Sequence, residues 1–124
     1  MQSVLGNTRK SDITFRKSGV IDLSASISKQ LSLNKGDVID ILCDKNEFYL
    51  YVKYRNPIGH HKSAVFPSNK KGKHYRVANV LLCDFILKIC NVTNKVSLCV
   101  GPAIQHYHCG TALPIITKYI INYE

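Results

Sequence analysis

The chain has 124 residues, a formal net charge of +9 and 45% hydrophobic residues. This size and composition predict a single domain over residues 1–124 with its own core, and they exclude two full-sized domains. No run approaches the roughly 18 apolar residues that a membrane-spanning helix needs, and the first ten residues lack the apolar segment of a secretory signal. We therefore expect a cytoplasmic protein with no membrane partner.

The N-terminal part of the chain predicts an arm followed by two short strands. Residues 1–12 show no hydrophobic periodicity, carry Arg9 and Lys10, and predict a mobile basic arm. Apolar and polar residues then alternate over 13–16 and over 20–23, as they do in half-buried strands. Gly19 lies between the two strands, where it can make the turn.

A helix and a hairpin complete the first half of the chain, residues 13–54. Ser24 precedes apolar residues at i, i+4 spacing, which predicts a short amphipathic helix over 25–31 with Ser24 as its cap. Residues 34–37, Asn-Lys-Gly-Asp, predict a tight turn. The β-branched run 38–42 and the aromatic run 48–54 flank a polar turn, so we expect them to pair as a hairpin.

Residues 55–74 predict a long basic loop that contains one candidate strand, Ala64–Phe66. The second half, residues 75–124, then repeats the order of the first. Strands are expected over 75–78 and 96–100, on either side of a helix over 81–90. Beyond them we predict a loop over 101–110 and a terminal strand over 113–123.

The two halves show the same spacing of apolar residues at an offset of 58 positions. At this offset Leu23, Ile27, Leu31 and Val38 fall on Leu81, Phe85, Ile89 and Val96. The match predicts that Leu81, Phe85 and Ile89 form the apolar face of the second helix. The expected fold is α+β and mainly β, a small barrel or strongly bent sheet with two short helices and two candidate pseudo-symmetric βαβ-like halves.

The chemistry-bearing residues favour neither an enzyme nor a cofactor site. The five cysteines contain no C-x-x-C pair and predict small buried hydrophobes in a reducing compartment. His106 and His108 would point to one side of a strand, beside Cys109, but no second pair occurs at zinc-finger spacing. Metal binding there stays open. Phosphate-cradling glycine motifs are missing from the sequence and paired carboxylates are scarce, so we expect a non-enzymatic protein.

One stretch carries a resemblance to a known family. Residues 15–52, FRKSGVIDLSASISKQLSLNKGDVIDILCDKNEFYLYV, contain a glycine turn, a short strand, a helical turn ending in Leu31-Ser-Leu33, a Gly36-Asp37 turn and a hairpin. This order resembles the AbrB-like (SpoVT/AbrB, MazE-type) swapped-hairpin family, and residues 13–54 would form the AbrB-like half.

The resemblance implies a small DNA-binding barrel of the kind found in transcription factors and antitoxins. Such proteins dimerise by exchanging hairpins and contact DNA through basic residues near the glycine turn and on the short helix. Arg16, Lys17 and Lys29 occupy those places here. Val20 stands where an Arg is typical, and Ser24 replaces the usual Pro. The chain is expected to be a homodimer, or a monomer whose second half replaces the dimer partner.

Charge distribution points to a polyanion as the partner. No acidic residue lies between Glu47 and Asp84, an interval that holds seven Lys and Arg residues. Basic groups contact phosphates, and exposed tyrosines can stack on bases. We therefore predict a nucleic-acid-binding or regulatory protein, with DNA favoured over RNA. The predicted contact residues are Arg16, Lys17, Lys53, Arg55, Lys62, Lys70, Lys71, Lys73, Arg76, Tyr49, Tyr51 and Tyr75.

An alternative use of the same basic loop stays open. The chain could be a protein-interaction or structural component, of phage or mobile-element type, that binds an acidic protein partner.

Overall fold

The computed structural model describes residues 11–57, 63–68, 73–118 and 122–123. Nearly all of the predicted arm and parts of the predicted basic loop lie outside these residues. The described strands are β1 (Ile13–Arg16), β2 (Val20–Leu23), β3 (Val38–Asp44), β4 (Glu47–Tyr54), β5 (Phe66–Pro67), β6 (Tyr75–Ala78), β7 (Lys95–Val100), β8 (Ile104–His106), β9 (Gly110–Ile116) and β10 (Asn122–Tyr123). The described helices are α1 (Ala25–Leu31) and α2 (Val80–Ile89).

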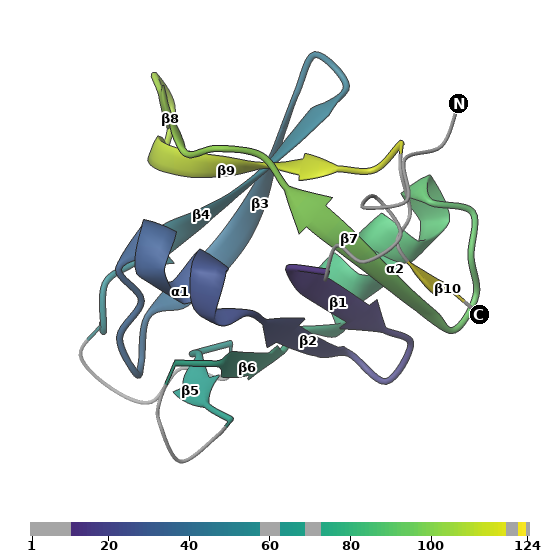
Figure 1. The fold of residues 1–124 in the computed structure, drawn as a ribbon, viewed down its shortest axis with the longest axis horizontal. Helices are drawn as coiled ribbons and strands as arrows, with labels where there is room; N and C mark the ends of the chain where they lie inside the picture. Colours follow the sequence, from purple (N-terminus) through teal and green to yellow (C-terminus); the bar gives the residue numbers. More distant parts are fainter. Residues whose placement is uncertain (1–10, 58–62, 69–72, 119–121, 124) are drawn as a thin grey trace, which may run out of the picture.

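The predicted class, α+β and mainly β, is confirmed. The strands form one strongly curled antiparallel sheet in the order β3-β4-β9-β7-β1-β2-β6-β5, with β8 paired to β9 and β10 to β7 (Figure 1). The predicted hairpin exists, since β3 and β4 pair from Val38–Tyr54 to Asp44–Glu47. Among the described helices, none is long and apolar enough to cross a membrane.

The two ends of the sheet meet at the start of β3. Val38 forms an isolated antiparallel bridge with Ala64, just before β5. The amide of Gly36 donates to the carbonyl of Val65 at 2.9 Å, and the amide of Val65 donates to the carbonyl of Asp37 at 2.8 Å. The predicted short strand at Ala64–Phe66 therefore contributes to the contact that brings the ends of the curled sheet together.

The two halves of the chain repeat one arrangement. The helix caps lie 55 positions apart: Ser24 accepts from the amide of Ile27, and Asn79 accepts from the amide of Leu82. β2 and β6 pair antiparallel from Val20–Ala78 to Leu23–Tyr75, as a twofold axis between them requires. The halves also contact through other strands, because β1 pairs with β7, and Ala64 in the segment between the halves bridges to Val38 at the start of β3.

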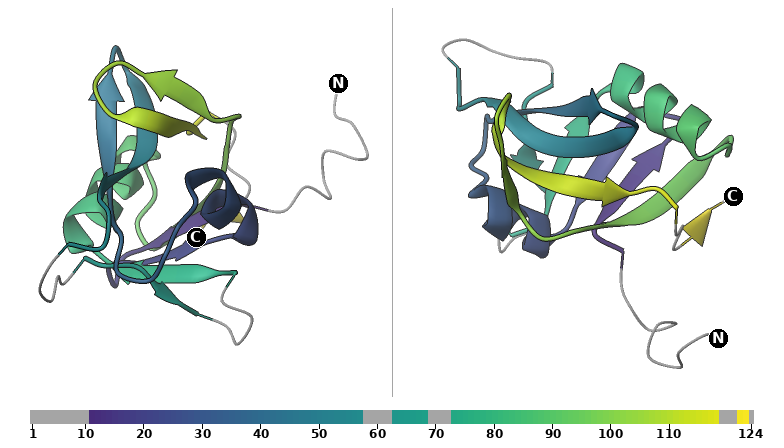
Figure 2. Two further views of the ribbon diagram at one scale, coloured as in Figure 1. Left: turned by 90° about the vertical axis from the view of Figure 1, so that its left-hand side faces the viewer. Right: turned by 90° about the horizontal axis from the view of Figure 1, so that it is seen from above.

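The core lies inside the curl of the sheet. Its largest fully buried side chains include Phe15, Ile21, Leu50, Leu98 and Leu113, which come from five different strands. The two helices lie on opposite sides of the curled sheet (Figure 2) and add buried side chains to the same core cluster. These side chains are Ile27 and Leu31 from α1 and Cys83, Ile86 and Leu87 from α2.

Three predictions about the second half are wrong. Helix α2 buries Cys83, Ile86 and Leu87, while the predicted apolar face of Leu81, Phe85 and Ile89 is exposed. The offset between the halves at the helix caps is 55 positions, which moves the core stripe by three residues. The predicted loop 101–110 also contains β8, which pairs with β9, and the predicted terminal strand ends at Ile116, with β10 as a separate strand on β7.

Candidate nucleic-acid interface

The predicted basic residues do not form a single patch in the described parts of the chain. Lys62, Lys70 and Lys71 lie outside the described residues. The other six form three groups in different parts of the fold: Arg16, Lys17 and Arg76 on β1, in the β1–β2 turn and on β6, Lys53 and Arg55 at the end of β4, and Lys73 beside α1.

The first group is organised by one carboxylate, Asp22. In β2 the inward residues Ile21 and Leu23 are buried, so Asp22 points out of the curled sheet. Its neighbour across β6 is Arg76, whose Nε donates to Oδ1 at 2.7 Å. Arg16 of β1 donates to the other oxygen, Oδ2. One arginine from each half of the chain thus binds the same aspartate.

The electrostatics of this trio keep Asp22 ionised. Partial burial raises the pKa of the Asp22 carboxyl, but the hydrogen bonds from Arg76 and Arg16 and their positive charges outweigh it, so the pKa lies below its usual value of 3.8. The side chains of Arg16 and Arg76 are 36% and 47% exposed. Asp22 therefore holds two guanidinium groups in fixed positions on an outer surface.

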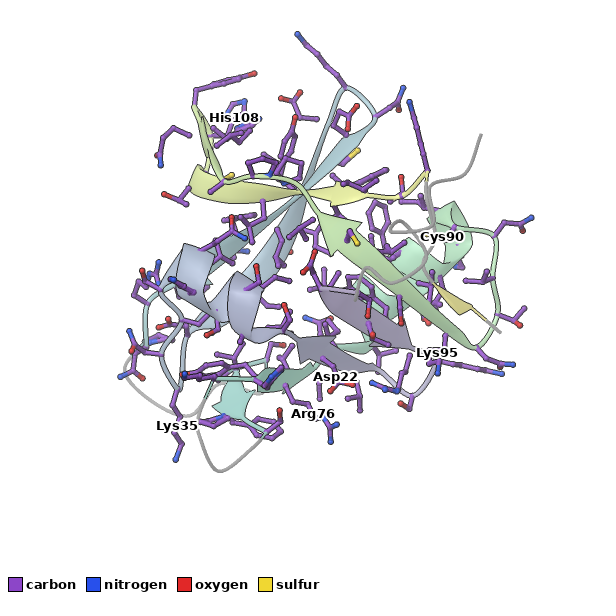
Figure 3. All side chains as sticks on the ribbon, in the orientation of Figure 1. Asp22, Lys35, Arg76, Cys90, Lys95 and His108 are labelled. Atoms are coloured by element: carbon purple, nitrogen blue, oxygen red, sulfur yellow. The ribbon has the colours of Figure 1, made fainter. Side chains whose placement is uncertain are left out.

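Two lysines extend this surface. Lys95 of β7 is the backbone partner of Arg16 in the pairing of β1 with β7. Lys17 follows Arg16 in the β1–β2 turn, is exposed, and donates its amide to the carbonyl of Asn94 at 2.8 Å. We name the set Arg16, Lys17, Asp22, Arg76 and Lys95 the basic face. Figure 3 shows its labelled members Asp22, Arg76 and Lys95 on one side of the molecule, far from His108.

An open polar groove of about 300 Å³ adjoins the basic face. Hydroxyl and imidazole groups line it beside Arg76, from Thr14, Ser24, Ser68 and His74. Hydroxyl groups and arginines are among the groups that contact phosphate oxygens. The carboxyl of Asp12, also at the groove, accepts from the amide of Val100 at 2.9 Å.

The second basic group has a structural role. Arg55 donates to the carboxylate of Asp37 at 3.0 Å and to the carbonyls of Leu31 and Ser32, at 2.8 and 2.9 Å, at the C-terminal end of α1. Lys53 lies 3.7 Å from the carboxylate of Asp40. These acids precede the acid-free interval in sequence, but the folding of β4 against β3 places them beside its first two basic residues.

The third group lies at α1. Lys73 and Lys29 line one open depression of about 430 Å³ together with Ala25, Ser26 and Ser28. Lys29 is the helix residue that the family resemblance implies as a DNA contact, and both lysines are exposed.

Of the three predicted stacking tyrosines, Tyr75 is buried, and Tyr49 and Tyr51 are half-buried and contact neighbouring side chains. Tyr75 is 7% exposed and its hydroxyl donates to the carbonyl of Leu33, so the prediction that its ring stacks on bases is wrong. The ring of Tyr49 lies 5.0 Å from that of His106. The hydroxyl of Tyr51 is 3.5 Å from Asp40, and burial together with that charge raises the pKa of Tyr51.

His106 at the end of β8 and His108 in the following turn are engaged in internal contacts. His106 is buried, its Nε2 lies 2.9 Å from Asp44, and its Nδ1 accepts from the amide of His108. Because Nδ1 accepts, Nε2 carries the proton of the neutral ring and donates to Asp44. Burial raises the pKa of the Cys109 thiol, which reduces its nucleophilic fraction at neutral pH. Within the described ranges no group of three His, Cys, Asp or Glu could hold a metal ion.

Lys95 and Asp22 were missed by sequence reasoning. Lys95 precedes the predicted strand 96–100 and begins β7 in the structure, and only the pairing of β7 with β1 places it opposite Arg16. The alternation of β2 does mark Asp22 as outward, but its role follows from its neighbours on β1 and β6.

Comparison with known proteins does not assign the chain to a family. No protein-family model, curated protein or solved structure matches the chain.

Proposed function

We propose that the chain is a non-enzymatic nucleic-acid-binding protein that contacts phosphates through the basic face. The observation that carries the proposal is the pair of arginines, one from each half, that Asp22 holds on the outer surface of β1, β2 and β6. Four basic side chains against one carboxylate leave this face with a net charge of +3. Prepositioned arginines lose less side-chain entropy on binding a phosphate than free ones do.

The neighbouring groove and lysines support contact with the sugar-phosphate backbone of DNA rather than with the edges of its bases. The groove supplies hydroxyl donors beside Arg76, while Lys29 and Lys73 add charge at α1. Contacts of this type fix a protein on a duplex without specifying sequence. Duplex DNA is the proposed ligand, and the proposed location is the cytoplasm, which the five free cysteines support.

We also propose that the chain is a single-chain version of the AbrB-like swapped-hairpin barrel. The pairing of β1 with β7 and of β2 with β6 supports it, because strands of one half pair with strands of the other. In this proposal the second half takes the place of the dimer partner. Arg16 and Lys17 beside the turn at Gly19 then correspond to the family's basic residues near its glycine turn.

A fluorescence-anisotropy titration with labelled duplex DNA tests the function. Binding is expected to weaken steeply between about 50 mM and about 200 mM salt because each contacted phosphate releases counterions. Replacing both arginines, Arg16→Ala with Arg76→Ala, is expected to reduce the slope of log affinity against log salt by about 2. The same titration with single-stranded RNA tests the preference for DNA.

Lys45→Gln provides the matched control. Lys45 is an exposed lysine in the β3–β4 turn, away from the basic face (Figure 1). Its removal should leave the salt slope unchanged. Equal losses per removed charge in the two variants would indicate diffuse charge attraction and contradict a defined face, and failure of the unmodified protein to bind DNA at low salt would remove the proposal.

Asp22→Asn is expected to change stability and binding in opposite directions. It removes the negative charge from the basic face, while the asparagine side-chain oxygen can still accept a hydrogen bond from an arginine and hold it in position, so DNA affinity at low salt should rise. It also removes two partly exposed ion pairs, so the free energy of unfolding should fall by about 1 kcal/mol at neutral pH. A DNA titration and a urea titration of the same preparation measure the two effects separately. An unchanged or lower DNA affinity would argue against contact at this face.

The pH dependence of stability follows from the lowered pKa of Asp22. A depressed carboxyl pKa adds stability above the unfolded value, near 3.8, and that contribution is lost as pH falls through the folded pKa. The Asp22→Asn protein should therefore lose less stability than the parent on acidification below this value.

A further inference from the structure

Helix α2 presents an apolar face to solvent. Val80 is 55% exposed, Leu81 81%, Phe85 40% and Ile89 37%, and these four form half of the large hydrophobic residues described as exposed. The opposite side of the helix already fills the core with Cys83, Ile86 and Leu87. The outer face is therefore additional to the apolar surface that folding requires.

The other half of the chain supplies an internal comparison. Helix α1 holds the equivalent place, 55 positions earlier by its cap, and it also buries one apolar side. Its exposed residues are polar, with Ser26 and Lys29 facing solvent. The fold is thus compatible with a solvated outer helix face. The apolar outer face of α2 is specific to that helix and indicates a partner.

We propose that the outer face of α2 binds the same face of a second copy of this chain, with the two helices antiparallel. The charged residues of the helix indicate which partner binds this face. Asp84 and Lys88 are its only charged residues, and both are exposed among the apolar side chains. In a twofold pair each Asp84 meets Lys88 of the second copy, so the face is complementary to itself.

The register of such a pair is compatible with the apolar residues. With Phe85 at the twofold axis, Leu81 lies against Ile89 of the second copy. Asp84 and Lys88 of the second copy are then offset by about 3 Å along the helix, which a lysine side chain spans. The ring of Phe85 packs edge-on against the ring of Phe48. The two ring centroids lie 5.6 Å apart, and the ring planes meet at 74°.

Charge elsewhere on the molecule also favours this face. The chain carries +9, so two copies repel each other over most orientations. Asp84 and Lys88 leave the α2 face neutral, so two copies that approach each other through this face meet no local charge repulsion. One short helix buries less than the roughly 800 Å² per partner of a stable dimer, so the dimer is expected to dissociate in the micromolar range.

Sedimentation velocity over a concentration series tests the proposal. The parent chain should shift from monomer to dimer as concentration rises. Leu81→Glu, at a site that is 81% exposed, should keep it monomeric without loss of folding. Tyr107→Ser is the control, because Tyr107 is 80% exposed in the β8–β9 turn, and the dimer should persist in it. A parent that stays monomeric up to about 1 mM would overturn the proposal.

A charge exchange tests the antiparallel pairing itself. Asp84→Lys and Lys88→Asp each place like charges opposite one another and should raise the dissociation constant at least about tenfold. Mixing the two variants restores opposite charges in a heterodimer, and combining both substitutions in one chain restores the homodimer. If the mixture associates no better than either variant alone, the helices do not pair in this way. Circular dichroism on each variant checks that it folds.

Discussion

Replacement of Asp37 by alanine is expected to lower the free energy of unfolding by about 3 kcal/mol. The Asp37 carboxylate is 1% exposed and accepts hydrogen bonds from the amides of Asn34 and Asn56 and from Arg55. Alanine would leave these donors without their partner. The loss also affects the contact between the ends of the sheet, because the carbonyl of Asp37 accepts from Val65 there. Urea denaturation measures the change.

Asp40→Ala is the matched control. Asp40 is also an aspartate near a basic residue of β4, but its side chain is 32% exposed and lies 3.7 Å from Lys53. Exposed ion pairs contribute little, so we expect a loss below about 1 kcal/mol. Equal losses in the two variants would contradict the role given to the buried Asp37 network.

Gly19→Ala is expected to destabilise the fold by about 2–4 kcal/mol. Gly19 has φ +94°, which L side chains rarely adopt. A Cβ there would also lie 2.7 Å from Cγ2 and 3.3 Å from Cα of Val80. The second contact is with backbone at the start of α2, so the helix itself would have to move. The hydrogen bond from the amide of Asn79 to the carbonyl of Gly19, at 2.7 Å, would be strained.

Gly110→Ala separates conformation from contact. Gly110 has φ +75°, and a Cβ there meets nothing within 4 Å. This variant should lose only the cost of the backbone conformation, about 1–2 kcal/mol. The difference between the two glycine variants then measures the close packing of the β1–β2 turn against α2, and no difference would refute that packing.

Local patterns predicted the fold class and the first half of the chain well. Alternation in 13–16 and 20–23 leaves one buried face, and the capped helix 25–31 and the 38–54 hairpin each depend on neighbours in sequence. Helix α2 differs because apolar residues occur all round it. With Leu81, Phe85 and Ile89 on one side and Cys83, Ile86 and Leu87 on the other, periodicity alone cannot decide which side the core takes.

The candidate site was only partly predictable, because the contacts between its residues depend on strand order and on partners distant in sequence. Arg16, Lys17 and Arg76 were expected contacts, but their relation to Asp22 and Lys95 depends on the order of strands β7-β1-β2-β6. An arginine such as Arg55 is a residue type that commonly contacts phosphates. Arg55 instead donates to carbonyls at the C-terminal end of α1 and to the carboxylate of Asp37. Its partners lie 18 to 24 positions away in sequence, beyond the reach of any local pattern.

The most direct measurement of the central claim is a map of the binding surface. Amide chemical shifts of the ¹⁵N-labelled protein, followed during titration with short duplex DNA at low salt, report which backbone groups sense the ligand. We predict that the shifted amides cluster in β1, β2, β6 and the first residues of β7. Shifts that centre instead on α2 or on the β8–β9 turn, or are spread evenly over the molecule, would contradict the assignment of function to the basic face.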